Sequence, residues 1–203
     1  MQYPKDDVRR KLLEAAARIF ARKGYLKASM RDIAAESGVG LSNIYNYYDS
    51  KDELFRHVVS PAVQVLERLL DEHHGRCGTD IMAMCSPDYC ERVVGEYVGF
   101  IDCQRRPLAL LLFRAQGSSL ENFREEFADR ATRLVEQYFA DMKRRHPQIA
   151  ADVSGFSIRM HTVWMFALLE EVVKRDVGPD ELKQIVSEYV TIEMAGWREL
   201  MKL

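Results

Sequence analysis

Apolar residues repeat at intervals of three and four along most of the chain, which is the spacing of one face of a helix. Strict alternation of apolar and polar residues, which would indicate a half-buried strand, does not run for long anywhere. The sequence therefore predicts an all-α fold. The first predicted helix ends at Gly24, and its apolar face consists of Val8, Leu12, Leu13, Ala16, Ile19 and Phe20.

A second, short helix is predicted after residue 29. Ser29 and Asp32 have the spacing of a capping box, in which each residue bonds the backbone of the other at a helix start. Gly38 can take the left-handed conformation that ends a helix, and the apolar Val39 is expected to fill the turn. These features indicate two helices joined by a tight turn.

The next helix is predicted to run from Gly40 to Tyr48. Ile44 and Tyr48 lie on one side at helical spacing and are expected to pack inward. The opposite side carries small and amide side chains without charge, which suits a helix that enters the major groove, where an Asn can bond adenine through two hydrogen bonds. These outward residues are Ser42, Asn43 and Asn46.

Neighbouring residues add candidate contacts to a nucleic acid. Leu41 is suited to the methyl group of a thymine, and the hydroxyls of Tyr45 and Tyr47 are suited to phosphates. Lys51 lies in the first turn of a further predicted helix, a position that favours phosphate. Candidate phosphate contacts from the first helix are Arg9, Arg10, Lys11 and Arg18.

The charge distribution separates the N-terminal segment from the rest. Residues 1–51 hold 10 Lys/Arg and 6 Asp/Glu, a net of +4, whereas residues 52–203 hold 19 and 25, a net of −6. The overall charge of −2 conceals this asymmetry. A basic segment on an acidic body favours a nucleic-acid interface over the alternative that the segment is an ordinary three-helix core with surface tyrosines.

The N-terminal quarter resembles the DNA-binding domain of the TetR family of bacterial transcriptional regulators. The residues that carry this resemblance are Gly24, Ser29-Met30-Arg31-Asp32-Ile33-Ala34, Gly38-Val39, Ile44-Tyr45-Asn46-Tyr47-Tyr48 and Lys51-Asp52-Glu53-Leu54-Phe55. The family often has Ser where this chain has Gly40, and Gly where it has Ser42. The operator sequences of relatives are therefore not transferred to this chain.

The resemblance implies a domain organisation and a set of DNA contacts. It implies a helix-turn-helix DNA-binding domain of three helices at residues 1–50 and a helical effector-binding and dimerisation domain at residues 51–203. Such proteins are homodimers that bind palindromic operators in double-stranded DNA. The residues at the family's DNA-contacting positions are Ser29, Arg31, Leu41, Ser42, Asn43, Tyr45, Asn46, Tyr47 and Lys51.

Breaks in the apolar pattern divide the C-terminal part into helices. Pro61 is expected to kink or break the helix that begins near Lys51, either as a fixed bend or as a hinge between the recognition helices. Pro107 is expected to start a helix, and Ser118 with Glu121 is expected to cap another. The remaining helices are predicted at about residues 87–103, 118–145, 152–175 and 179–202.

The last two predicted helices are the candidates for dimerisation. The first of them is apolar nearly all round, which implies burial on several sides and leaves one side for a partner subunit. Pairing would place two recognition helices about 34–36 Å apart, which is one turn of DNA.

A pocket for a small, largely apolar effector is a further hypothesis, against the simpler reading that these side chains only form a core. Aromatic and methionine side chains suit an apolar ligand, and a His or Arg can orient its polar end. The candidate lining residues are Tyr97, Phe100, Cys103, Phe113, Arg114, Phe127, Met160, His161, Trp164 and Met165.

The four cysteines are expected to be free thiols, because the chain has the character of a cytoplasmic protein. Cys77, Cys85 and Cys90 lie near His73 and His74, but no CxxC pair is present and the spacing is loose, so we expect no metal site. Cys103 is the fourth cysteine. Sensing of metal or redox state by these residues is the minor alternative.

The leading hypothesis is a ligand-responsive transcriptional repressor. No run of about 18 apolar residues and no apolar leader is present, so a cytoplasmic protein without membrane contact is expected. A Gly-rich phosphate loop, GxSxG and HExxH are all absent, so we expect neither a cofactor nor enzymatic activity. The alternatives are a helical enzyme or carrier with a purely structural N-terminal module, and an architectural DNA-binding protein without an effector. The effector, the operator and the sign of regulation do not follow from the sequence.

Overall fold

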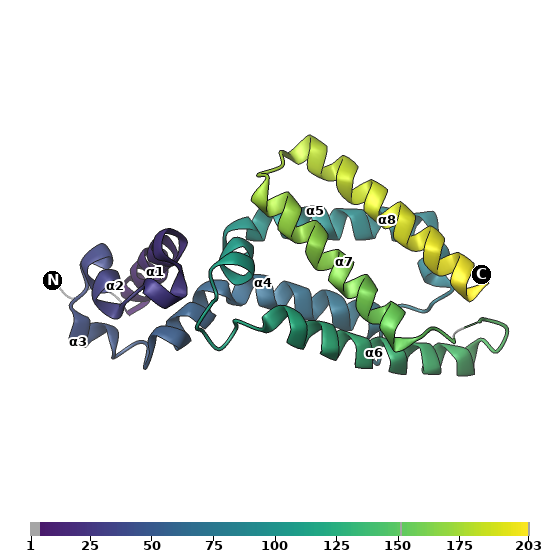
Figure 1. Ribbon diagram of the computed structural model, residues 1–203, viewed down its shortest axis with the longest axis horizontal. Coiled ribbons are helices and arrows are strands. Elements are labelled where there is room, and N and C mark those ends of the chain that lie inside the picture. Colours follow the sequence, from purple (N-terminus) through teal and green to yellow (C-terminus); the bar gives the residue numbers. More distant parts are fainter. Residues whose placement is uncertain (1–4, 151, 203) are drawn as a thin grey trace. The chain divides into compact units, whose positions relative to one another are not determined.

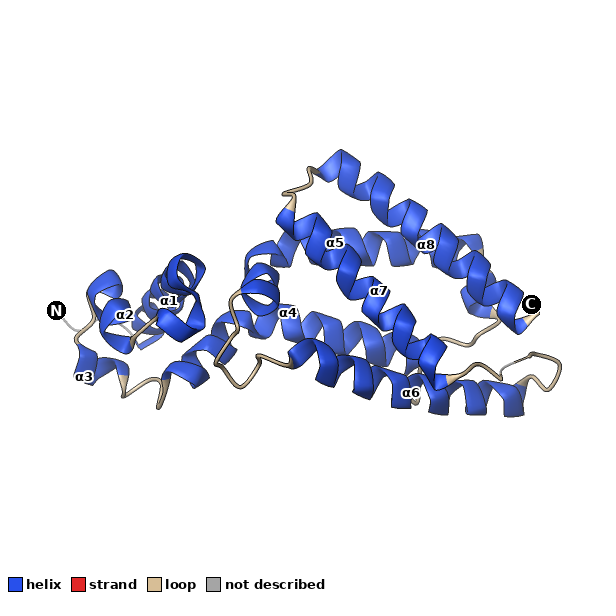
Figure 2. Cartoon of the chain, viewed as in Figure 1, coloured by secondary structure: helices blue, strands red, loops and turns tan. Residues whose placement is uncertain are grey.

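The computed structural model describes residues 5–150 and 152–202, and every regular element in these ranges is a helix (Figures 1 and 2). This confirms the predicted all-α fold. The elements are α1 (Lys5–Lys27), α2 (Met30–Ser37), α3 (Leu41–Ile44), α4 (Lys51–His74), the short 3₁₀ helix η1 (Ala83–Cys85), α5 (Pro87–Phe113), α6 (Phe123–Arg145), α7 (Gly155–Lys174) and α8 (Pro179–Met201).

The chain forms two compact units. Unit 1 comprises Met1–Gln64 and Arg106–Phe123, and unit 2 comprises Val65–Arg105 and Arg124–Leu203. Defined by its internal contacts, unit 1 thus extends beyond residue 50 to Gln64 and also includes Arg106–Phe123. The functional boundary after residue 50 stays a prediction.

The core of unit 1 is built from the first four helices. The apolar faces predicted from the sequence supply it, because Leu12 and Phe20 of α1 and Ile33 of α2 are fully buried. The ring of Phe20 meets the ring of Phe55 of α4 edge-on, with centroids 5.0 Å apart. The other fully buried residues of these four helices are Ala15, Ala16, Ile44, Leu54, Phe55, Val59 and Ala62.

The first helix is interrupted at its predicted end, Gly24, but α1 continues to Lys27. Gly24 has φ +71° and ψ 164°, which interrupts the helical geometry although the helical hydrogen bonding continues to Lys27. This region of backbone conformation is essentially restricted to glycine. The backbone N–H of the next residue, Tyr25, leaves the helix and donates to the carbonyl of Arg114 at 2.9 Å.

The expected break at Pro61 is wrong, because α4 continues through this residue. Proline lacks the N–H that would bond the carbonyl of His57, four residues earlier. The hydroxyl of Ser60 donates to that carbonyl at 2.9 Å and satisfies the acceptor. Whether Pro61 acts as a hinge stays a prediction.

The two helices predicted around residue 105 form one element with a kink. Gln104 has φ −116° and ψ 16° inside α5, and the chain resumes helical geometry after it. Pro107 therefore lies in the first turn of the second segment, where a missing N–H costs little.

The expected cap at Ser118 is wrong, because α6 begins only at Phe123. The Ser118 hydroxyl instead donates to the carbonyl of Ala115 at 2.6 Å, and the Glu121 carboxylate accepts the N–H of Gly117. Both groups therefore stabilise turns of the connecting loop. The last two helices match their predicted ranges to within three residues.

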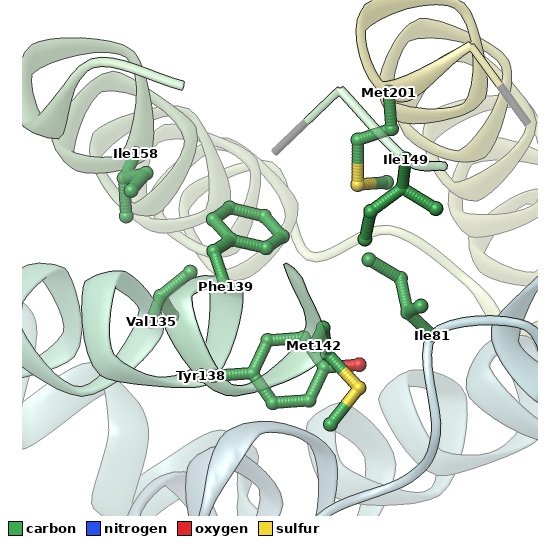
Figure 3. Packing of buried hydrophobic residues seen from close by; sticks show 8 residues of the cluster. All are labelled: Ile81, Val135, Tyr138, Phe139, Met142, Ile149, Ile158 and Met201. Atoms are coloured by element: carbon green, nitrogen blue, oxygen red, sulfur yellow. The ribbon is translucent and has the colours of Figure 1, made fainter. Parts of the chain in front are cut away.

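Unit 2 has its own core, which is centred on α6 (Figure 3). Val135, Tyr138, Phe139 and Met142 project from α6 and meet apolar side chains from α7, α8 and two loops. The Tyr138 hydroxyl donates to the Thr79 carbonyl at 2.8 Å, so this buried polar group is satisfied. The partners from the other segments are Ile81, Ile149, Ile158 and Met201.

Candidate nucleic-acid interface and effector cavities

The start of α2 is held by the predicted capping box. The N–H of Asp32 donates to the Ser29 hydroxyl at 3.1 Å, and the N–H of Ser29 donates to the Asp32 carboxylate at 3.0 Å. Lys23 of α1 donates to the same carboxylate at 2.7 Å. These bonds hold the pKa of Asp32 below its ordinary value. Gly38, with φ +69°, ends α2 as predicted.

A second set of ion pairs fixes α2 against α1. Glu36 accepts hydrogen bonds from Arg18 at 2.8 Å and from Arg22 at 2.7 Å, and these two bonds lower its pKa. The guanidinium of Arg18 is therefore committed to the helix pair, which makes it a less suitable phosphate contact than its position in the sequence indicated.

The helix predicted from Gly40 to Tyr48 is much shorter than expected. Only Leu41–Ile44 form α3, and residues 45–47 form a turn. The N–H groups of Asn46 and Tyr47 bond carbonyls three residues earlier, at 3.2 and 2.9 Å. Such bonds tighten a chain that is rich in Asn and Tyr, which are weak helix formers.

The two sides of this segment nevertheless separate as predicted. Ile44 is fully buried and Tyr48 is 1% exposed. The amide of Asn46 donates to the side-chain oxygen of Asn43 at 3.1 Å, so these two outward side chains lie together. Asn46 keeps one N–H and its oxygen for an external partner. Leu41 and Tyr47 are half-buried, and the fully exposed outward residues are Ser42, Asn43, Tyr45 and Asn46.

Lys51 has an internal role that the sequence did not indicate. Its ammonium donates to the carbonyls of Tyr25 and Ala28 at 2.8 and 2.9 Å and lies 4.1 Å from the centre of the Tyr25 ring. Burial lowers its pKa. Only one of the three ammonium protons remains for DNA. The contact of Lys51 with phosphate stays a prediction.

The remaining predicted contacts lie on the surface of unit 1. Arg31 is exposed, and Ser29 is exposed with its hydroxyl engaged in the capping box. Arg9 of α1 lines a surface hollow together with Asp6 and three residues of the recognition segment, so the structure brings a cation next to the outward amides. Those three residues are Asn43, Asn46 and Tyr47.

Two adjoining cavities lie within unit 2, each with a volume of about 80 Å³. Their walls are mainly apolar, and four residues line both of them. The shared residues are His74, Val135, His161 and Thr162.

Half of the predicted effector residues line these cavities. Tyr97, Phe100, Phe127, His161 and Met165 line the second cavity, and His161 lines the first as well.

The other half do not line these cavities, and their role in binding an effector stays a prediction. Met160 and Trp164 are 46% and 42% exposed because they occupy the face of α7 opposite its buried residues. Cys103 is exposed, and Phe113 and Arg114 follow the kink of α5 into unit 1.

A buried polar cluster at the cavity wall was not predicted. The Glu193 side chain is 4% exposed and contacts Nδ1 of His161, while the indole N–H of Trp197 lies 3.4 Å from its carboxylate. Burial raises the pKa of Glu193 to about 7 and lowers that of His161 to about 4. One feature of the sequence could have indicated this cluster. Glu193 lies four positions from both Tyr189 and Trp197, so it falls on the apolar face of α8.

The histidines near the cysteines are engaged in other contacts. His73 accepts the Tyr89 hydroxyl at 2.7 Å and donates to Glu96 at 2.8 Å. Burial lowers the pKa of His74 to about 3. Within residues 5–150 and 152–202, no group of three His, Cys, Asp or Glu side chains could hold a metal ion, and the four cysteines are free thiols. In the same ranges, no helix is both long and apolar enough to cross a membrane.

Comparison with known proteins agrees with this architecture. Residues 12–58 match the family described as bacterial regulatory proteins, tetR family. The uncharacterized HTH-type transcriptional regulator YfiR of Bacillus subtilis is 35% identical over 68 residues, which cover 34% of this chain and 33% of YfiR. The chain thus aligns with about a third of that relative's length.

Solved structures extend the similarity to most of the chain. SCO3833, a TetR-family member from Streptomyces coelicolor, is 27% identical, with 88% of both chains covered and a TM-score of 0.58. The regulator FadR of Bacillus subtilis, solved in complex with stearoyl-CoA, has the same fold at 16% identity, with 92% of this chain and 98% of FadR covered and a TM-score of 0.58. The chain thus carries an N-terminal segment that matches the TetR family of bacterial transcriptional regulators, and its fold is that of solved members of this family.

Proposed function

We propose that this protein represses transcription by binding a palindromic operator as a homodimer. The observation that carries the proposal is the separation of sides in residues 41–48, where Ile44 and Tyr48 are buried and uncharged polar side chains face outward. Such an edge suits base contacts in the major groove, and the net charge of +4 over residues 1–51 suits the phosphates around it. Proteins of this family are regulators rather than enzymes, and binding to chromosomal DNA places the protein in the cytoplasm.

Exposed apolar side chains on α7 and α8 support dimerisation. Phe156, Met160 and Trp164 follow one another at intervals of four on α7 and are 74%, 46% and 42% exposed. On α8, Ile192 and Leu200 are 59% and 57% exposed. Large apolar side chains exposed along one face of a helix favour an interaction site, and a dimer formed here would present the recognition segment twice.

The cavities of unit 2 support a small, largely apolar effector. Their walls are mainly apolar, and a protein of the same fold, FadR, was solved with stearoyl-CoA. An effector that binds one conformation of the dimer more tightly shifts the population toward that conformation. The size of the shift is limited by the difference between its affinities for the two conformations. We propose that the favoured conformation separates the recognition segments wrongly for the operator.

Fluorescence anisotropy with duplex DNA from beside the protein's own gene tests the proposal. We expect sequence-dependent binding that weakens as salt rises, because phosphate contacts release counterions. Replacing Asn43 and Asn46 together by Ala is expected to remove about 1–3 kcal/mol of discrimination for each amide that bonds a base. Equal affinity for an unrelated duplex would reject the regulator and favour an architectural protein.

A further inference from the structure

We propose that the ligand of the unit 2 cavities is an amphipathic organic acid, with its apolar body inside the first cavity and its carboxylate bound by Arg198. Among the described residues that line this cavity, Arg198 alone has a permanently charged side chain. The inference identifies the chemical class of the effector, and only its regulatory consequence rests on the proposed function.

Among the residues that the structure describes, Arg198 has no charged partner. It lies in the last turn of α8, is exposed, and forms no ion pair with any residue in the described ranges. Its guanidinium is therefore available to a ligand. The planar fork of an arginine matches the two oxygens of a carboxylate, which makes this pair stronger and more directional than one formed by lysine.

The interior of the cavity suits the apolar part of such a ligand. Val135, Phe139 and Ile158 line its wall. His74 and His161 are uncharged near neutral pH because burial disfavours the imidazolium, so the interior offers no cation. An ionised group is costly to bury without a partner, and the acid is therefore expected to stay at Arg198. The second cavity lies next to the first and shares four lining residues with it.

A cationic ligand fits the same cavity less well. The carboxylate of Glu193 contacts two residues of the cavity wall, but Glu193 itself lines neither cavity. His161 and Trp197 contact this carboxylate from the cavity side, and its side chain is 4% exposed. An amine would therefore meet Arg198 at the mouth without reaching Glu193.

The test uses the full-length protein with a single fluorescent reporter. The chain has two tryptophans, and Trp164→Phe leaves only Trp197, which lines the first cavity. Dodecanoic acid, dodecanol and dodecylamine are titrated below the concentrations at which they form micelles. We expect the acid to change the Trp197 emission and to bind at least tenfold more tightly than the alcohol, with the amine weakest. Isothermal calorimetry on the protein with both tryptophans checks that Trp164→Phe has not altered the site.

Arginine variants identify the contact. Arg198→Gln is expected to reduce the affinity for the acid to that for the alcohol, without changing the affinity for the alcohol. Arg198→Lys retains the charge and is expected to recover part of the affinity. Arg68→Gln is the matched control, because Arg68 is also exposed, has no ion pair among the described residues and lines neither cavity.

The outcomes that overturn the proposal are specific. Equal affinity for acid and alcohol, tighter binding of the amine, no binding of any of the three, or an Arg198→Gln variant that binds the acid normally would each reject it. Operator binding is measured separately. An operator-binding protein that binds no acid would retain the proposed function and lose this ligand class. Acid binding that leaves the operator complex intact would support the site and reject its role in regulation.

Discussion

At the scale of single residues, the cap of α2 and the cluster around Glu193 differ in how far apart in the sequence their members lie. The Ser29–Asp32 capping box and the left-handed Gly38 both involve residues at most four positions apart. The cluster of His161, Glu193 and Trp197 was not predictable, because His161 and Glu193 come from different helices. Periodicity shows that Glu193 faces the core, but it cannot show which side chain meets it there.

Gly24 provides a test of backbone conformation. We expect Gly24→Ala to lower the free energy of unfolding by about 1–3 kcal/mol, because its φ of +71° with ψ of 164° is strained for any residue with a Cβ. Space is not the cause, since the nearest atom to an added Cβ, on Arg114, is 3.9 Å away. Urea denaturation at fixed protein concentration measures the change.

The matched control for this substitution is Gly95→Ala. Gly95 lies inside α5, and an added Cβ there meets nothing within 4 Å. This variant is expected to gain about 0.5–1 kcal/mol, because alanine favours a helix interior. Equal effects of the two substitutions would contradict the argument from conformation.

Glu193 predicts a pH dependence of stability. Its pKa is raised from 4.5 to about 7 in the folded protein, so folding favours its protonated form. The stabilisation is present below pH 4.5 and is lost as pH rises toward 7. Glu193→Gln keeps the shape without the charge. We subtract the free energy of unfolding of the unmodified protein from that of Glu193→Gln. We expect this difference to rise by up to about 3 kcal/mol between pH 4.5 and pH 8.

Urea denaturation at several pH values measures this difference. His74 and His161 have lowered pKa values, so they destabilise the fold as pH falls through the pKa of an unfolded histidine. Both histidines are present in the variant and in the unmodified protein. The comparison therefore isolates Glu193 and its coupling to His161. A difference that stays constant between pH 4.5 and pH 8 would show that Glu193 is not buried as a neutral acid.

At the scale of elements, helix identity was more predictable than helix boundaries. The ranges of α7 and α8 follow from uninterrupted apolar periodicity. The errors at Pro61 and Ser118 both involve a side-chain hydroxyl that bonds a nearby backbone carbonyl. The Ser60 hydroxyl donates to the carbonyl of His57, and the Ser118 hydroxyl donates to that of Ala115. The shortness of α3 has a similar cause, since closely spaced Asn and Tyr residues favour a tight turn over a longer helix.

Lys51, at the start of α4, bonds both the end of α1 and the loop that follows it, and its substitution is expected to destabilise unit 1. Lys51→Met retains the apolar stem and leaves the carbonyls of Tyr25 and Ala28 without their donor, which we expect to cost about 1–3 kcal/mol. The exposed Lys27 forms no ion pair among the described residues, so Lys27→Met is expected to change stability by less than about 0.5 kcal/mol. Thermal unfolding monitored by circular dichroism measures both variants.

The same pair of variants separates the two roles of Lys51. A lysine that contacts phosphate contributes roughly one unit to the slope of log affinity against log salt. With only one free proton on its ammonium, Lys51 is expected to contribute less than that. A full unit lost in Lys51→Met, with unchanged stability, would favour the DNA contact over the internal role.

At the scale of the whole molecule, the family fold was predictable from the N-terminal motif, whereas the placement of residues 106–123 in unit 1 was not. This segment is held there by long-range bonds, including those from the N–H and hydroxyl of Ser119 to the Asp52 carboxylate at 2.8 and 2.7 Å. Bonds between residues so far apart leave no periodic signal. The same reason explains why the periodicity did not show that Phe113 and Arg114 belong to unit 1.

Dimerisation is the property of the whole molecule on which operator recognition depends. Phe156→Glu combined with Ile192→Glu places charges on the exposed apolar faces of α7 and α8, where desolvating them would oppose association. We expect the mass measured by light scattering to fall from twice the chain mass of 23.5 kDa to a single chain. Operator affinity should fall at least a hundredfold, because one subunit contacts only one half-site. Met82→Glu, on a residue that is 44% exposed outside these helices, should change neither quantity. A double variant that remains dimeric and binds the operator normally would place the interface elsewhere.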